Sequence, residues 1–148
     1  MVSTASGRNK VNVPRHHAFG CLIPVLLVLA ACRPDASTPR GIAERFLDAH
    51  YVHIDLPAAL EFTAGLARHK VEGELKLVAG QAIDETTRKP TVYYRLLEEH
   101  PDGTRAVRYL YRGTITVEDA DRFERRWLVT VRNEDGGWHV TNYEELEG

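Results

Sequence analysis

Apolar and polar residues alternate over most of the second half of the chain, a pattern typical of strands that bury one face. Between residues 105 and 117, Val107 and Tyr109 fall on one side, whereas Arg108 falls on the other. Successive side chains of a strand point to opposite faces, so one face is predicted to pack and the other to meet water. The alternation recurs over residues 91–99, 123–132 and 138–143. Four successive strands joined by short turns predict an antiparallel meander.

A helical segment precedes these strands and is predicted to begin near residue 41. Ile42, Phe46 and Ala49 are spaced so that they share one face of a helix. Ser37 or Thr38 is placed to cap its first turn, because a hydroxyl oxygen accepts a hydrogen bond from the free backbone N–H groups there. The apolar face of this helix is therefore a predicted part of the core.

A second helical stretch is predicted from residue 56 to residue 79. Asp55 is its candidate N-cap, and Pro57 lies in its first turn, where proline is tolerated. Gly65 lies inside the stretch and weakens a helix, so the segment is either one rod or two helices that meet at an angle. The apolar residues that recur at helical spacing are Leu60, Ala64, Ala67, Val71, Leu75 and Val78.

Helices grouped before long antiparallel strands predict an α+β domain in which the sheet curls around the helices. The helical block from Asp55 to Leu75 and the hairpin residues Gly137-Trp138-His139-Val140 resemble the NTF2-like superfamily of cone-shaped domains, also called SnoaL-like or cystatin-like. The resemblance spans about Pro39 to Glu147. It implies N-terminal helices packed on a curved four-stranded antiparallel meander.

The first 31 residues have the layout of a secretory signal. Arg8, Lys10 and Arg15 are their charged residues, and no acidic residue accompanies them. The apolar run that follows, residues 20–31, would span about 18 Å as a helix, well short of the roughly 30 Å hydrocarbon core of a bilayer. The run therefore predicts a signal sequence rather than a permanent transmembrane helix.

The apolar run ends in Leu29-Ala30-Ala31-Cys32, which resembles the lipobox of bacterial lipoproteins. The resemblance implies that a signal peptidase cleaves between Ala31 and Cys32 and that Cys32 carries two or three acyl chains. Each buried methylene contributes about 0.8 kcal/mol, so several chains anchor a protein durably. The alternative interpretation is a buried helix over residues 20–32 in which Cys32 is an ordinary core thiol.

Residues 33–40 contain two prolines and small polar side chains, and this composition predicts a flexible tether. Together with the lipidated Cys32, the predicted anchor and tether span residues 32–40. The folded domain is then predicted over residues 41–148. Arg33 follows the cysteine at the position where an Asp favours retention in the inner membrane. The lipoprotein resemblance therefore implies the cell envelope as the location, with the periplasmic face of the outer membrane favoured over the inner membrane.

The predicted mature chain is acidic overall, which bears on its partners. Three of the 19 basic residues and none of the 21 acidic ones precede Cys32, so the remainder has a net charge of −5. Nucleic acid is excluded as the expected partner, because its backbone normally requires a basic field. Six arginines are spread along the interiors and ends of the predicted strands, in addition to Arg105 at the first position of one of them: Arg95, Arg108, Arg112, Arg125, Arg126 and Arg132. They either pair with glutamates across strands or form a patch that meets phospholipid or lipopolysaccharide phosphates.

The predicted cone offers aromatic residues rather than a catalytic motif. Its candidate ligand-lining residues are Tyr94, Tyr109, Tyr111 and Trp127. No catalytic residue and no cofactor is predicted, since the sequence contains no P-loop, no GxGxxG and no GxSxG. Enzymes of the superfamily place an Asp with a His or Tyr inside the cone, and by that resemblance Asp48 and His50 are among the residues that could supply such a pair.

His50 and His53 are the remaining candidates for chemistry. On a helix, residues three apart share a face and could present two imidazoles to a metal, with His69 or Asp55 as a third ligand. Neither spacing matches a zinc motif, so no metal site is predicted. The ordinary interpretation is two surface histidines at a helix end.

These patterns lead to two functional hypotheses. The first is a membrane-anchored lipoprotein without catalytic activity, whose domain binds a protein partner or a small hydrophobic ligand. A sealed cone would favour the protein partner, whereas an open apolar cavity of a few hundred Å³ would favour the ligand. The second is an enzyme of the dehydratase, isomerase or cyclase kind, which a buried Asp or His with a perturbed pKa in a cleft would favour. A homodimer is compatible with both.

Overall fold

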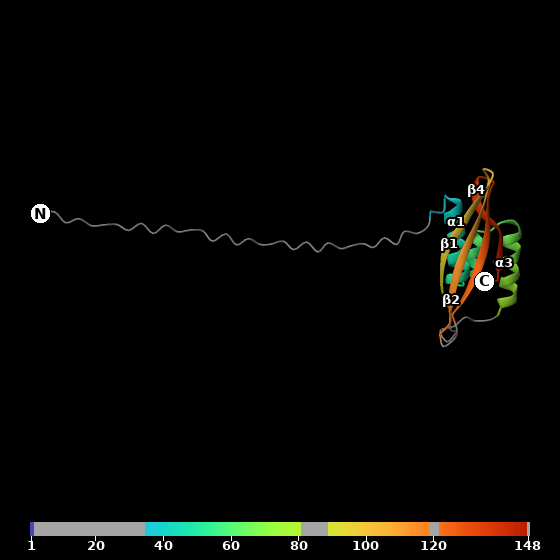
Figure 1. The fold of residues 1–148 in the computed structure, drawn as a ribbon, viewed down its shortest axis with the longest axis horizontal. Helices are drawn as coiled ribbons and strands as arrows, with labels where there is room; N and C mark the ends of the chain where they lie inside the picture. Colours follow the sequence, from blue (N-terminus) through green and yellow to red (C-terminus); the bar gives the residue numbers. More distant parts are fainter. Residues whose placement is uncertain (2–34, 81–88, 119–121, 148) are drawn as a thin grey trace. The chain divides into compact units, whose positions relative to one another are not determined.

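The computed structural model describes residues 1, 35–80, 89–118 and 122–147. The predicted cleavage and lipidation site, Ala31 and Cys32, lies outside these residues. In the described domain the helices come first and the strands follow (Figure 1). The elements are α1 (Pro39–Leu47), the π-helical turn η1 (Asp48–Val52), α2 (Leu56–Glu61), α3 (Gly65–Val78), β1 (Thr91–Asp102), β2 (Ala106–Thr116), β3 (Phe123–Glu134) and β4 (Gly137–Leu146).

The strands form one antiparallel sheet in the order β1-β2-β3-β4, which confirms the predicted meander. Tyr109 on β2 lies opposite Val129 on β3, so apolar residues of neighbouring strands meet on one face. The register shifts between Leu96 and Glu98 on β1 and beside Thr130 on β3. Such bulges bend a strand and increase its twist, which lets the sheet curve around the helices.

Two predicted helix caps are present. Thr38 Oγ1 accepts a hydrogen bond of 3.0 Å from the backbone N–H of Gly41, so Thr38 rather than Ser37 caps α1. Asp55 Oδ1 accepts one of 3.0 Å from the N–H of Ala58 and caps α2. None of the described helices is long and apolar enough to cross a membrane.

The second helical stretch consists of two helices, α2 and α3, because the chain between them pairs with the sheet. Val140 on β4 donates its N–H to the carbonyl oxygen of Phe62 at 2.9 Å, and Ala64 donates to the carbonyl oxygen of Val140 at 2.9 Å. These two bonds form a short parallel bridge. Gly65 follows with φ +53°, a backbone conformation that glycine adopts without steric cost, and α3 then begins in a new direction.

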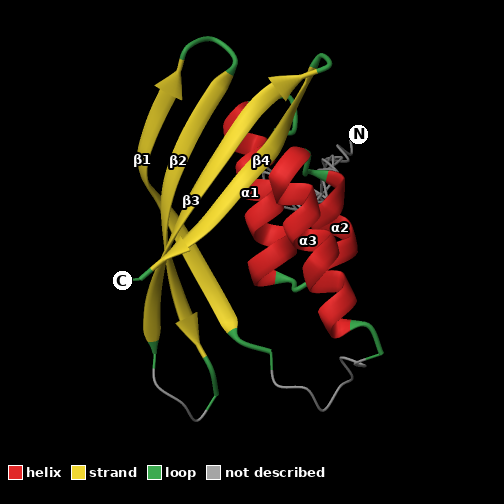
Figure 2. Ribbon diagram, turned by 90° about the vertical axis from the view of Figure 1, so that its right-hand side faces the viewer, coloured by secondary structure: helices red, strands yellow, loops and turns green. Residues whose placement is uncertain are grey.

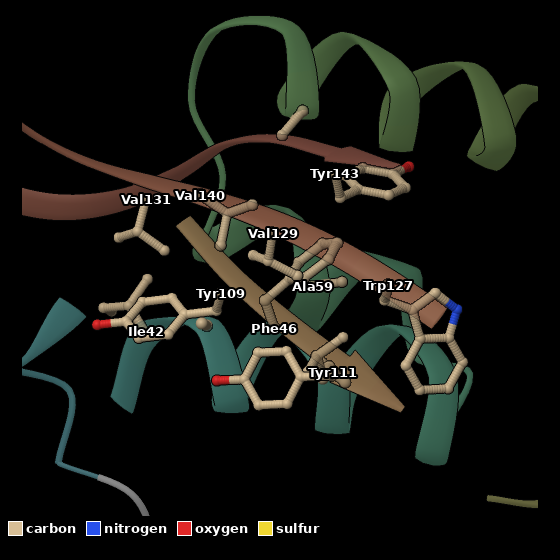
Figure 3. Packing of buried hydrophobic residues seen from close by; sticks show 14 of the residues in the cluster. Ile42, Phe46, Ala59, Tyr109, Tyr111, Trp127, Val129, Val131, Val140 and Tyr143 are labelled. Atoms are coloured by element: carbon tan, nitrogen blue, oxygen red, sulfur yellow. The ribbon is translucent and has the colours of Figure 1, made fainter. Parts of the chain in front are cut away.

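The helices cover one face of the sheet, and the core lies between the two layers (Figure 2). The fold is therefore α+β, as the sequence predicts. Figure 3 shows the side chains that fill the space between the helices and the inner face of the strands. They include Ile42, Phe46, Ala59, Tyr109, Tyr111, Trp127, Val129, Val131, Val140 and Tyr143.

Candidate functional site

The residues predicted to line the cone lie on the inner face of the sheet, within tight packing. Tyr109, Tyr111 and Trp127 are fully buried, and Tyr94 is half-buried. The rings of Tyr94 and Tyr111 meet edge to face with 5.7 Å between centroids, and Tyr51 of η1 stacks on Trp127 at 4.2 Å. Burial raises the pKa of Tyr109 to about 12 and also raises that of Tyr111, so both phenols are neutral at pH 7.

Gly113 on β2 shows how closely the interior is filled. A Cβ atom on this residue would lie 2.2 Å from Cη2 of the Trp127 ring and 2.4 Å from Cζ3. The indole therefore lies directly over the glycine backbone and occupies the space that any larger side chain would need. Glycine inside a strand commonly marks such a close approach.

A second group of side chains joins η1, α3 and β4. Glu74 on α3 bridges two partners: its Oε2 lies 2.6 Å from His50 Nε2, and its Oε1 accepts a hydrogen bond of 2.6 Å from the Tyr143 hydroxyl. Phe46 packs against both rings, at 5.1 Å from His50 and 5.0 Å from Tyr143. Lys70 donates to the backbone oxygen of Tyr143 at 2.7 Å. We call His50, Glu74 and Tyr143 the bridged cluster.

The charge state of His50 follows from its burial. The side chain is 9% exposed, and burial lowers the pKa of His50 although the carboxylate of Glu74 acts in the opposite direction. The imidazole is therefore neutral at pH 7. Because a carboxylate can only accept, Nε2 carries the hydrogen and Nδ1 keeps a lone pair. Nδ1 is buried and has no hydrogen-bond partner among the described residues.

An irregular connection between α1 and α2 shapes a hollow of about 260 Å³. In η1 the N–H of His53 donates to the carbonyl oxygen of Asp48 at 2.8 Å, so one extra residue enters the turn. Ile54 follows with φ +54°, an unusual value for a β-branched residue. The hollow is lined by Asp48, His53 and Asp55, among others, and Tyr94 donates its hydroxyl to Asp48 Oδ1 at 2.7 Å. No sequence pattern indicated the π-helical turn or the strained Ile54.

His50 and His53, which are three residues apart in the sequence, lie in different surroundings in the structure. His53 is exposed at the hollow, whereas His50 is buried in the bridged cluster, so the interpretation of two surface histidines is wrong for His50. His69 lies elsewhere on α3 and is 3.7 Å from Glu72. Within residues 35–80, 89–118 and 122–147, no group of three or more His, Cys, Asp or Glu side chains could hold a metal ion.

The strand register gathers three of the six arginines. Arg95 on β1 lies opposite Arg112 on β2, and Arg112 lies opposite Arg126 on β3. The neighbours of Arg112 in the chain, Tyr111 and Gly113, face the core, so Arg112 points to the other face, which no described helix covers. We call Arg95, Arg112 and Arg126 the arginine row.

The other arginines of the strands lie apart from this row. Arg108 and Arg132 line a separate hollow on the sheet, and Arg125 forms an ion pair of 2.8 Å with Glu145. The cross-strand pairing with glutamates that the sequence allowed is therefore present for Arg125, and Arg112 forms a looser ion pair of 3.9 Å with Glu124. In contrast, the arginine row places like charges directly opposite one another.

Comparison with known proteins defines the fold. No family model matches the chain, and no curated protein matches it. An association domain of the calcium/calmodulin-dependent protein kinase type II kind from Thiobacillus denitrificans is 16% identical with a TM-score of 0.58, over 76% of this chain and 96% of that one.

Two further solved structures are similar to this domain over most of their length. A ketosteroid isomerase-like protein from Erwinia carotovora atroseptica is 16% identical over 74% of this chain and 93% of its own, with a TM-score of 0.54. An NTF2-like protein from Shewanella oneidensis is 12% identical over 70% of this chain and 92% of its own, with a TM-score of 0.52. At such identities the likeness shows the fold alone. The domain has the NTF2-like, or cystatin-like, fold, as the sequence resemblance implies.

Proposed function

We propose that this chain is an envelope lipoprotein, anchored through a lipidated Cys32, whose NTF2-like domain binds a protein partner without catalysing a reaction. The basic leader, the short apolar run and Leu29-Ala30-Ala31-Cys32 support the anchor. Arg33, rather than Asp, follows Cys32, and this favours the periplasmic face of the outer membrane as its location. The domain would then act close to the membrane surface, in a cell envelope compartment.

The observation that carries the binding function is the filled interior of the cone. A pocket for a small hydrophobic ligand is usually a cavity of several hundred Å³ that encloses most of the ligand. Here Tyr109, Tyr111 and Trp127 have no exposed surface and occupy that position. A small-ligand role would require these residues, with Tyr94, to line an open cavity. Recognition through the outside of the domain is therefore the better supported proposal.

The anchor is tested by replacing Cys32 with Ala. We expect this variant to accumulate as precursor and to lose labelling by radioactive palmitate, because no thiol remains for acylation. Cys21→Ala is the matched control, since it removes the other cysteine of the chain and should leave labelling intact. Labelling that persists in Cys32→Ala would contradict the anchor.

The mode of binding is tested on protein extracted from its own membranes. Native mass spectrometry of the full chain should show no stoichiometric small molecule, because the described interior is filled with side chains. A photo-crosslinking amino acid at exposed positions such as Leu66 or Leu77 should give one defined protein adduct in cells, whereas one at buried Tyr111 should not. A tightly held small molecule with no protein adduct would refute the protein-partner proposal.

A second candidate is an enzyme in which His50 acts as a general base. The observation in its favour is a neutral imidazole held by Glu74 with a free lone pair on Nδ1, the arrangement that orients a catalytic histidine. The ketosteroid isomerase-like neighbour makes this candidate relevant. Its test is deuterium uptake next to the carbonyl of small hydrophobic ketones, which should be catalysed by the native chain and lost in His50→Gln. No uptake by the native chain would refute it.

A further inference from the structure

The arginine row places like charges opposite one another on three neighbouring strands, and contacts within the described domain offset this charge only in part. Side chains directly opposite each other on neighbouring strands are about 5 Å apart at Cβ, and like charges there are destabilising. Arg112 Nε lies 3.9 Å from Glu124 Oε2, a loose contact, and Arg126 donates to the backbone oxygen of Glu147 at 2.9 Å. No described carboxylate pairs with Arg95. The row therefore keeps most of its positive charge available to an external anion.

A hollow of about 360 Å³ lies at one end of the row. Its lining includes Arg95, Arg112 and a further arginine, Arg122, together with the Thr114 hydroxyl. Guanidinium groups bind phosphate through paired, parallel N–H donors, and a hydroxyl adds another donor. The carboxylate of Glu124 lies in the same hollow, 3.9 Å from Arg112 Nε, so an external anion would displace this loose contact. The three arginines and the hydroxyl give the site the chemistry of a receptor for an oxyanion such as a phosphodiester.

An exposed aromatic residue lies beside the arginines. Tyr93 is 69% exposed and lines the hollow. Aromatic side chains beside cationic ones suit the boundary between lipid headgroups and acyl chains, because one end is apolar and the other is polar. A free phosphate in water would need the arginines but not this exposed ring.

We propose that the arginine row and its hollow hold the domain against the phosphate headgroups of anionic phospholipids. The inference rests on the proposed function, since a lipidated Cys32 would keep the domain near the bilayer. The segment from Cys32 to α1 at Pro39 reaches at most about 25 Å, less than a typical domain diameter, so the domain would remain within contact distance. Because the predicted mature chain has a net charge of −5, a local cluster of arginines rather than the overall charge would draw the domain to an anionic surface and so set its orientation.

The experiment uses the purified full chain with Cys32→Ser, so that acyl chains do not contribute. Its partition onto phosphatidylcholine vesicles is compared with partition onto vesicles that also contain phosphatidylglycerol. The ratio of the two partition coefficients cancels binding by the apolar N-terminal run, which is common to both kinds of vesicle. The basic leader also favours anionic vesicles, but it is the same in every variant, so comparison between variants isolates the contribution of the arginine row. We expect the ratio to favour phosphatidylglycerol at low salt and to fall towards one at high salt.

Arg95→Gln/Arg112→Gln should reduce that ratio about 25-fold at low salt, since each arginine near an anionic surface contributes about fivefold. The matched control is Arg68→Gln/Lys76→Gln, which removes two exposed charges from α3 on the helical side of the domain. The control should keep the preference. Circular dichroism of both variants confirms that each is folded.

Three outcomes would overturn the proposal: no preference for phosphatidylglycerol, an equal loss in the two variants, or binding of a polyglutamate peptide through Arg95 and Arg112 without vesicle binding. The last would identify an acidic protein as the partner. Because the vesicle assay does not use acylation, its failure leaves the palmitate result at Cys32 unaffected, and the two can be distinguished.

Discussion

Replacing Gly113 with Ala is the most direct test of a filled cone. The new methyl carbon would lie 2.2 Å from Cη2 and 2.4 Å from Cζ3 of Trp127, whereas ordinary contacts are at least 3.4 Å. The ring would have to move by about 1 Å, as the difference between these distances requires. It has no exposed surface, and Tyr51 stacks on it at 4.2 Å, so no free space receives it.

The expected cost is about 3 kcal/mol, at the upper end for overpacking in a rigid core. A loss of that size lowers Tm by roughly 10–20 °C in a domain of about this size. The φ angle of Gly113 is not in the left-handed region, so backbone strain does not contribute. The methyl group alone is therefore responsible for the predicted loss.

Urea unfolding of the full chain, followed by tryptophan fluorescence and circular dichroism, measures this cost. Gly73→Ala is the matched control: it lies in α3, where the new Cβ would meet no atom within 4 Å beyond the neighbouring backbone of its own helix, and it should stabilise by about 0.5–1 kcal/mol. In a Trp127→Leu background, Gly113→Ala should cost less than about 1 kcal/mol, because the clashing ring is gone. A native-like midpoint for Gly113→Ala alone would show that the interior has room.

Three further predictions concern single contacts. Asp55→Ala should cost about 1 kcal/mol by urea unfolding, because the N–H of Ala58 loses its cap, and Asp55→Asn should restore most of it; equal losses would argue against capping. Tyr94→Phe should cost about 1 kcal/mol in the same assay, since it removes the 2.7 Å hydrogen bond to Asp48, and an unchanged midpoint would contradict that bond. The folded pKa of His50 is lowered, so below its ordinary value of 6.5 the unfolded chain binds more protons. The free energy of unfolding should therefore fall as the pH drops from 6.5 towards the lowered pKa of His50. Urea midpoints measured across that range should decline less steeply in His50→Gln. An identical pH dependence in the variant would refute the lowered pKa of His50.

Secondary structure followed closely from local patterns. Alternation over residues 91–99 and 123–132 identified β1 and β3, and the strands extend further because backbone pairing continues to the hairpin ends, as in Asp102 opposite Ala106. The caps at Thr38 and Asp55 were predictable because a cap depends on residues three positions apart. Where a local pattern left two alternatives, at Gly65, the bridge to β4 decided between one helix and two.

The candidate sites were less predictable. The spacing of His50 and His53 in the sequence places them on one face of a predicted helix. In the structure the partner of His50 is Glu74, which is 24 residues away on another helix. The π-helical turn that carries His50 has no sequence signature, because it depends on how α1 meets the sheet and α2. The arginines of the strands were visible in the sequence, but whether they gather or scatter depends on register.

The amino-acid sequence by itself determined the order and type of the elements, because helical and strand periodicity and capping act over a few neighbouring residues. The tertiary structure alone decided that Trp127 fills the cone over Gly113, that Glu74 joins His50 to Tyr143, and that three arginines align across β1, β2 and β3. These arrangements join residues far apart in the chain. Their energies arise only when the sheet register and the packing of the helices bring the partners into contact.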